Sequence, residues 1–192
     1  MDNAQWVSVI IAAIVLITIA LTGAAFDISN STPATVPETT TEPQSECKIT
    51  YTIYDVPLSR ELQIYTQELC ETCNVPFETV LSVMFVESSF NENAVNGNCY
   101  GLMQVNSIHS EVLAKLGITD LKDPKQNIEA GILILSTLFK QYDETTALMA
   151  YNCGRAKANQ MIESGITSTS YTRKVKSFTE TLQVKERIYI FE

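Results

Sequence analysis

The chain has 192 residues, of which 45% are hydrophobic, and a formal net charge of −9. This length suits one folded domain with an additional segment. Because the chain has 22 acidic but only 13 basic residues, a nucleic-acid partner is not expected, since phosphate binding needs a basic surface.

The first segment contains an apolar run from Trp6 to Phe26 without a charged residue. A helix rises 1.5 Å per residue, so about 20 such residues cross the ~30 Å hydrocarbon core of a membrane. A cleaved signal peptide has a basic N-terminal stretch and a shorter apolar run. Residues 1–26 are therefore predicted to form an uncleaved transmembrane anchor, with a signal peptide as the alternative.

The next segment, residues 27–46, is rich in Ser, Thr, Pro and Glu and has few apolar side chains. It cannot bury enough apolar surface to offset the entropy lost on ordering, so it is predicted to be a disordered linker. The folded domain is then expected to span residues 47–192, which is long enough for a single core.

Two helices are predicted at the start of this domain. Pro57 fits a first helical turn, and apolar residues follow at steps of three or four up to Cys73. Pro76 opens a second helix that continues to Glu87 in the same way. Its residues are apolar nearly all round, which is typical of a buried central helix.

The remainder of the domain is also predicted to be helical. Asp123 followed by Pro124 predicts a capped helix start, and Gly154 predicts a helix end. The further helices are expected at 109–116, 124–139, 147–151, 155–164 and 170–182, and strands only at 49–54 and 188–191. The fold class is therefore predicted to be mostly α with a single core.

Glu87 stands out because it ends the most apolar helix of the chain. Helical spacing places Val80 and Met84 on its own face. Burial there disfavours the charged carboxylate and raises its pKa, which suits a general acid near neutral pH. The alternative is a helix-terminal Glu that turns out to water.

Two further motifs add the groups that a sugar site needs. Gly101–Gln104 is a glycine-led turn that carries a side-chain amide, and Ala150–Gly154 supplies a phenol and another amide at a helix end. One acid, several amides and an aromatic platform together favour a glycan substrate.

Three motifs of the chain resemble those of the soluble lytic transglycosylases, which share the goose-type lysozyme fold. They are Glu87–Phe90, Tyr100–Asn106 and Ala147–Gly154, in the order and at the spacing of that family. The resemblance runs from about Val56 to Phe178. It implies cleavage of the β-1,4 bond between N-acetylmuramic acid and N-acetylglucosamine in peptidoglycan, leaving a 1,6-anhydro end.

The resemblance also implies roles for particular residues. Glu87 matches the catalytic acid and base, and the residues that match substrate-binding positions are Ser88, Gln104, Tyr151, Asn152 and Tyr171. A further motif of the family, around Tyr171, is weak here because Thr167 stands where the family has Glu. Other departures, at Asn96, Asn106 and Cys153, concern glycan subsite preference more than chemistry.

The motifs contain one buried acid, whereas most glycoside hydrolases use two carboxylates. Glu92 lies in an Asn-rich loop and is expected to be exposed. In the resembling family the C6 hydroxyl of muramic acid attacks, so that one Glu donates a proton and later accepts one. A hydrolytic lysozyme on the same fold and a non-catalytic wall-binding or assembly module are the alternatives.

Neither a cofactor nor a metal is expected. Cys70 and Cys73 form a lone CxxC motif within a helix, which favours core or disulfide roles over a metal site. The resemblance implies peptidoglycan strands as the substrate and, by analogy only, a secretion or conjugation apparatus as a partner. Because peptidoglycan lies outside the membrane, a single-pass membrane protein with its catalytic domain outside the cytoplasm is expected.

Overall fold

The structure is a computed structural model that describes residues 48–191. The predicted anchor, residues 1–26, and the predicted linker, residues 27–46, lie outside the described residues. Residues Tyr51–Ile188 form one compact unit, to which every described helix belongs. Among these helices, none is both long enough and apolar enough to cross a bilayer.

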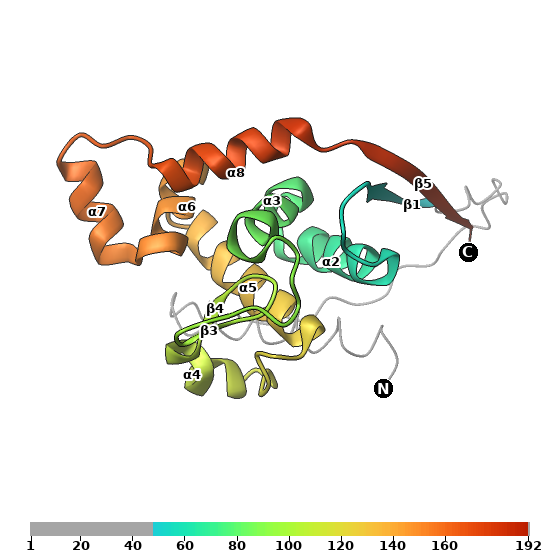
Figure 1. The fold of residues 1–192 in the computed structure, drawn as a ribbon, viewed down its shortest axis with the longest axis horizontal. Coiled ribbons are helices and arrows are strands. Elements are labelled where there is room, and N and C mark those ends of the chain that lie inside the picture. The colour runs from blue at the N-terminus through green and yellow to red at the C-terminus, as the bar shows by residue number, and fades with distance from the viewer. Residues whose placement is uncertain (1–47, 192) are drawn as a thin grey trace, which may run out of the picture. The chain divides into compact units, whose positions relative to one another are not determined.

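Helices dominate the described part of the chain, as the spacing of apolar residues predicts (Figure 1). They are α2 (Arg60–Cys73), α3 (Phe77–Ser88), α4 (Ser110–Ala114), α5 (Pro124–Phe139), α6 (Glu144–Cys153), α7 (Arg155–Glu163) and α8 (Ser170–Thr181), with a short 3₁₀ turn, η1 (Ser107–His109), before α4. The mostly α fold class is therefore confirmed.

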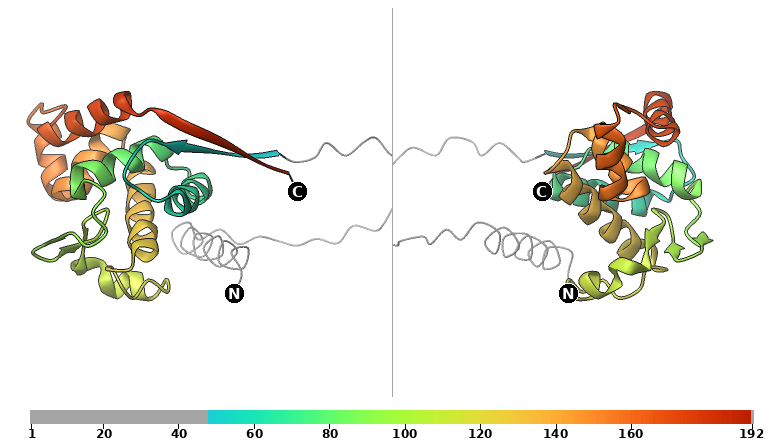
Figure 2. Two further views of the ribbon diagram at one scale, coloured as in Figure 1. Left: turned by 45° about the vertical axis from the view of Figure 1, so that its right-hand side comes forward. Right: turned by 90° about the vertical axis from the view of Figure 1, so that its left-hand side faces the viewer.

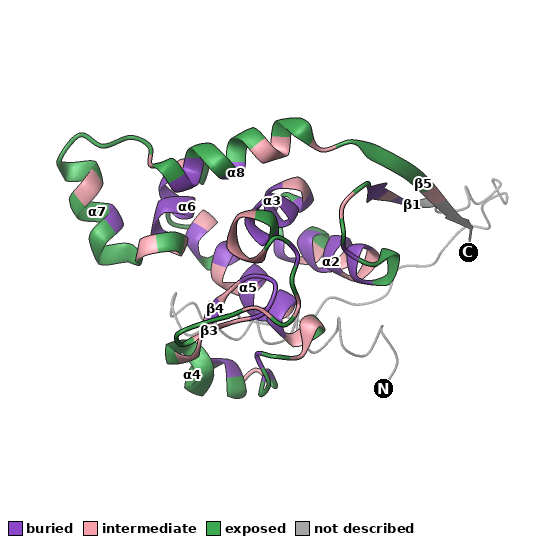
Figure 3. Ribbon diagram, in the orientation of Figure 1, coloured by how far each residue is buried: buried purple, intermediate pink, exposed green. Residues whose placement is uncertain are grey.

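Helix α3 lies at the centre of the Tyr51–Ile188 unit, between α2 and α8. Its residues Val80, Leu81, Val83 and Met84 have no solvent exposure, and Figure 3 shows the buried positions concentrated on α2, α3, α5 and α6. The prediction of a buried central helix is confirmed. Phe85 differs, because 40% of its surface is exposed. Its ring packs against that of Phe178 in α8 and that of Phe90 in the loop after α3.

The start of α2 corrects the prediction that Pro57 lies in a first helical turn. The helix begins at Arg60, because Ser59 caps it by accepting a 3.2 Å hydrogen bond from the Leu62 amide. Gln63, which is 2% exposed, donates to the carbonyl oxygens of Tyr54 and Leu58. These bonds hold the preceding turn outside the helix and attach it to β1 (Lys48–Tyr54).

Three other predicted helix boundaries agree with the structure, whereas α6 begins at Glu144, three residues before its predicted start, and α4 ends at Ala114, two residues before its predicted end. Asp123 caps α5 by accepting from the Gln126 amide at 2.9 Å. Gly154 ends α6 with φ of +81°, a left-handed conformation that glycine adopts without strain. Thr169 caps α8 and exchanges reciprocal hydrogen bonds with Thr172, which sets the position of Tyr171 in the first turn of α8.

The strands are more extensive than the sequence predicts. Strand β1 pairs with β5 (Val184–Phe191), which begins four residues before the predicted start because its charged residues 185–187 hide the strand pattern (Figure 2). Three two-residue strands were not predicted: β2 (Val95–Asn96), β3 (Cys99–Tyr100) and β4 (Val105–Asn106). They form an antiparallel sheet in which β3 is central, and Gly97 and Asn98 form the turn between β2 and β3.

Candidate active site

Glu87 lies in the last turn of α3, where its side chain is half-buried. The hydroxyl of Tyr171 donates a 2.7 Å hydrogen bond to Glu87 Oε1. Burial raises the pKa of Glu87, and the hydrogen bond from Tyr171 opposes this shift by stabilising the charged carboxylate. The structure therefore places Glu87 in the environment that its helix face predicts, together with Tyr171 from α8.

Tyr151 comes from α6 and lies close enough to Glu87 for the charge of the carboxylate to act on it. Its hydroxyl donates a 2.8 Å hydrogen bond to the Met103 carbonyl oxygen. Burial raises the pKa of Tyr151 and of Tyr171, and the nearby negative charge of Glu87 raises both further. Both phenols therefore stay protonated and act as hydrogen-bond donors at the candidate site.

Ser88 joins α3 to the loop that contains Gly101–Gln104. Its Oγ lies 2.8 Å from the Leu102 carbonyl oxygen and 3.1 Å from that of Met84. A hydroxyl has one hydrogen to donate, so this hydrogen is directed at the main chain. Ser88 thus orients the loop beside Glu87, and its predicted contact with substrate would use the oxygen lone pairs.

Gln104 is likewise directed at the main chain. Its amide nitrogen donates to the carbonyl oxygens of Ala94, at 3.1 Å, and Gly101, at 2.9 Å. Both amide hydrogens are therefore used, and Oε1 is the atom left for a substrate donor. Gln104 itself has φ of +46°, in the left-handed region, so these two bonds also stabilise an unfavourable backbone conformation.

Asn152 is the predicted site residue that the structure leaves outside this hydrogen-bonded group. It follows Tyr151 in the last turn of α6, and its side chain is exposed. Its predicted substrate contact stays a prediction. Glu87, Ser88, Gln104, Tyr151 and Tyr171, by contrast, are linked either directly or through the Gly101–Gln104 loop.

Asn127 on α5 is a site residue that the sequence analysis missed. It has no solvent exposure, and its Oδ1 accepts from the Met103 amide at 2.9 Å. Its Nδ2 donates to the carbonyl oxygens of Tyr100, at 2.7 Å, and Leu121, at 2.9 Å. The bonds to Met103 and Tyr100 hold the loop that carries Gln104, and the bond to Leu121 holds the segment before α5.

Gly131, one turn after Asn127, allows the same loop to approach α5 closely. A Cβ atom at Gly131 would lie 2.3 Å from Met103 Sδ, and one at Gly101 would lie 2.5 Å from the Asn127 side chain. The signal in the sequence for this close approach is an Asn and a Gly four residues apart, which therefore lie on one face of an amphipathic helix.

The four cysteines of the described part of the chain are free thiols. Cys70 and Cys73 are buried thiols in α2, and burial raises the pKa of both. Cys99 and Cys153 are also free thiols. Within residues 48–191, no group of three or more His, Cys, Asp or Glu side chains is arranged to hold a metal ion.

The arrangement of helices around Glu87 is the fold of lysozyme-like lytic transglycosylases. The structure superposes on an inactive mutant of the lytic transglycosylase Slt from Pseudomonas aeruginosa with a TM-score of 0.55, at 20% sequence identity. The match covers 64% of this chain and 24% of the Slt chain, so this protein spans about a quarter of that larger one. Residues 64–172 match the transglycosylase SLT domain, and the chain belongs to this family of enzymes.

The chain is also similar to three curated proteins, of which one is named a transglycosylase. Protein IpgF of Shigella flexneri is 27% identical over 127 residues, which are 62% of this chain and 84% of IpgF. A transglycosylase of the Enterobacteria phage PRD1 is 36% identical over 104 residues, or 53% of this chain and 37% of the phage protein. Invasion protein IagB of Salmonella typhimurium is 34% identical over 90 residues, or 42% of this chain and 56% of IagB.

Proposed function

We propose that the protein is a peptidoglycan lytic transglycosylase that cleaves the β-1,4 bond between N-acetylmuramic acid and N-acetylglucosamine, with Glu87 as acid and then base. The observation that carries this proposal is the environment of Glu87, a half-buried carboxyl at the end of an apolar helix with one phenol as its hydrogen-bond donor. Membership of the SLT family supports the substrate class.

The geometry around Glu87 suits proton donation. Tyr171 donates to Oε1, so the proton of the neutral acid is best placed on Oε2, from which it passes to the leaving glycosidic oxygen. Burial keeps more of the acid protonated at a given pH, because it disfavours the carboxylate.

A single carboxylate is sufficient if the nucleophile belongs to the substrate. Burial and Tyr171 account for the shifted pKa of Glu87, with no contribution from a second described carboxylate. In the proposed reaction the C6 hydroxyl of the muramic acid residue attacks C1, and its proton passes to the Glu87 carboxylate. The acid is thereby restored without water, and the intramolecular attack gains effective molarity.

Mass spectrometry of the muropeptides released from purified peptidoglycan tests the proposed reaction. A lytic transglycosylase releases 1,6-anhydro ends, which are one water lighter than the reducing ends that a hydrolytic lysozyme releases. Reducing ends as the initial products would contradict the proposed chemistry and favour the lysozyme.

The proposal includes a membrane anchor at residues 1–26 and a linker at residues 27–46, which place the catalytic domain outside the cytoplasm. The support is the apolar run from Trp6 to Phe26 and the location of peptidoglycan. The intact mass of the protein from the membrane fraction should include residues upstream of Gly23. A mature chain that starts between Ala25 and Asp27 would show that the segment is a cleaved signal peptide.

A Tyr171→Phe variant tests the hydrogen bond to Glu87. The bond stabilises the charged carboxylate, so its loss should raise the pKa of Glu87 further and move the alkaline limb of the pH–rate profile to higher pH. A charge-assisted bond of about 1.5–3 kcal/mol that orients the acid implies a roughly tenfold or larger fall in cleavage rate. The measurement is the rate of peptidoglycan cleavage against pH.

Tyr142→Phe is the matched control, because it removes a phenol hydroxyl from a half-buried tyrosine that makes no contact with Glu87. Its pH profile should coincide with that of the wild type. An unchanged alkaline limb in Tyr171→Phe would mean that the Tyr171 bond does not tune the acid.

A further inference from the structure

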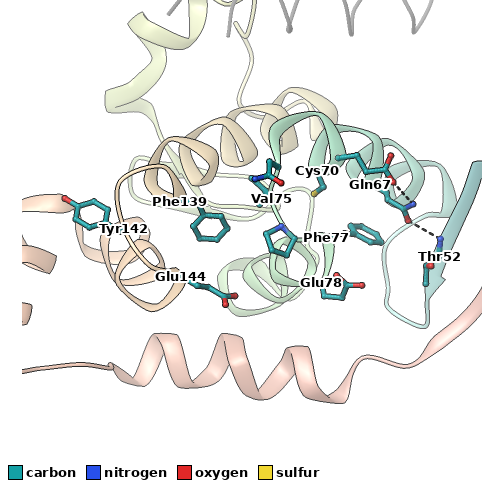
Figure 4. A pocket seen from close by; sticks show the side chains of 12 residues that line it. Thr52, Gln67, Cys70, Val75, Phe77, Glu78, Phe139, Tyr142 and Glu144 are labelled. Atoms are coloured by element: carbon teal, nitrogen blue, oxygen red, sulfur yellow. Dashed lines mark hydrogen bonds between the residues drawn. The ribbon is translucent and has the colours of Figure 1, made fainter. Parts of the chain in front are cut away.

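A groove of about 610 Å³ lies at the first turn of α3, between the end of α2, the end of α5 and the start of α6 (Figure 4). Val75, Phe77 and Phe139 give it an apolar lining. The labelled side chains extend from Tyr142 at one end to Thr52 at the other, so the groove is elongated rather than round. Its volume is in the range of ligand sites of roughly 300–1,000 Å³.

This groove is separate from the candidate active site. Phe77 and Glu78 begin α3, whereas Glu87 lies nine residues after Glu78, which is about 14 Å along the helix axis. The groove lining includes none of the residues linked to Glu87. The groove therefore needs an occupant other than the glycan bond that is cleaved.

The charged side chains of the groove are all acidic. Glu71, Glu78 and Glu144 line it, and the lining contains no Lys, Arg or His. Neutral donors orient each of them: Tyr54 donates to Glu78 at 2.6 Å, Thr79 to Glu144 at 3.0 Å, and Gln67 to Glu71 at 3.2 Å.

None of these three carboxylates forms an ion pair within the described residues. The ion pairs of residues 48–191 involve other acids, namely Asp55, Glu61, Glu111 and Glu186. A groove that combines oriented carboxylates outside any ion pair with apolar side chains in its lining is complementary to a ligand that combines cationic and apolar groups.

We propose that this groove binds a peptide segment of a partner protein in which Lys or Arg residues alternate with apolar residues. The methylene stems and apolar side chains would cover the half-buried rings of Phe139 and Tyr142, and the cationic groups would meet the carboxylates of Glu78 and Glu144. The elongated shape favours a peptide over a compact amine. Helix α3 also begins at Pro76 without a side-chain cap, so its first amides can donate to peptide carbonyl oxygens.

The test is a fluorescence-anisotropy titration of the full chain with a short, labelled, capped peptide of alternating Leu and Lys. A peptide of alternating Leu and Glu is the ligand control. We expect the Lys peptide alone to bind, and its affinity to fall as the salt concentration rises, because the ionic contacts are partly exposed. Equal binding of both peptides would overturn the proposal.

The double variant Glu78→Gln/Glu144→Gln should weaken binding of the Lys peptide at least about tenfold, on the scale of close interfacial charge pairs. Gln retains the oxygens that accept from Tyr54 and Thr79, so the fold and peptidoglycan cleavage should be retained. Glu71→Gln, on an exposed side chain, should weaken binding by about threefold without any risk to the fold. Glu163→Gln on α7, outside the groove, is the matched charge control and should bind as the wild type does.

Unchanged affinity in the double variant would overturn the proposal. Displacement of the peptide by n-butylamine at an equal concentration would also overturn it, because it would identify a small amine as the occupant. The inference does not rest on the proposed reaction. Glu87→Gln should bind the Lys peptide with wild-type affinity, so a failure of either proposal is distinguishable from a failure of the other.

Discussion

Replacing Glu87 with Gln is expected to lower peptidoglycan cleavage by at least about 10²–10⁴-fold, the range attributed to general acid–base catalysis. The amide is close in shape to the carboxyl and can still accept the hydrogen bond from Tyr171, so the fold should persist. It has no acidic proton for the leaving oxygen and cannot accept one from the C6 hydroxyl. The loss should therefore appear in the rate of muropeptide release.

Glu92→Gln provides the control for this experiment. Glu92 is the next acidic residue in the chain and lies in the loop after α3, where its side chain is half-exposed. Its replacement removes the same charge and should leave the cleavage rate within about twofold of the wild type, because a surface charge contributes little. If Glu87→Gln retained more than half of the wild-type rate, Glu87 would not be the acid.

Replacing Asn127 with Ala is expected to lower the free energy of unfolding by about 3–5 kcal/mol. The change removes the side-chain partner of the Met103 amide and of the carbonyl oxygens of Tyr100 and Leu121, at a residue that has no solvent exposure. Each buried group that loses its partner costs about 1–3 kcal/mol. Urea unfolding monitored by circular dichroism gives this free energy.

The matched control for Asn127→Ala is Asn159→Ala, which truncates an exposed Asn on α7 and should change stability by less than about 0.5 kcal/mol. Because the Asn127 bonds hold the loop beside Glu87, cleavage by Asn127→Ala should also fall at temperatures where it remains folded. A destabilisation below about 1 kcal/mol would mean that water or a shifted loop satisfies these groups instead.

The helices could be predicted where local signals dominate. The cap at Asp123 and the apolar surface of α3 depend on neighbouring residues, so the sequence alone locates both. Pro57 is compatible with a helix start, but the cap at Ser59 and the bonds of Gln63 to the preceding turn place that start at Arg60. The two-residue strands β2, β3 and β4 are too short to have a recognisable period.

The candidate site could be predicted in part. Glu87 attracts attention because a carboxyl interrupts an apolar helix, and Tyr171 because of its motif, and the structure joins them. The sequence cannot tell which atoms of Ser88 and Gln104 are already used by the main chain. In the sequence, Asn127 resembles a polar residue on the outer face of an amphipathic helix. Only the structure shows that the Gly101–Gln104 loop packs against it.

The way the Gly101–Gln104 loop is held has a consequence for how substrate enters. Leu102 and Met103 have no solvent exposure, and the loop is bonded to α3, α5 and α6 at once. It can open only when the packing of these three helices opens, so it cannot serve as a lid. This wall of the site is preorganised, and a glycan strand that binds against it incurs little reorganisation cost there.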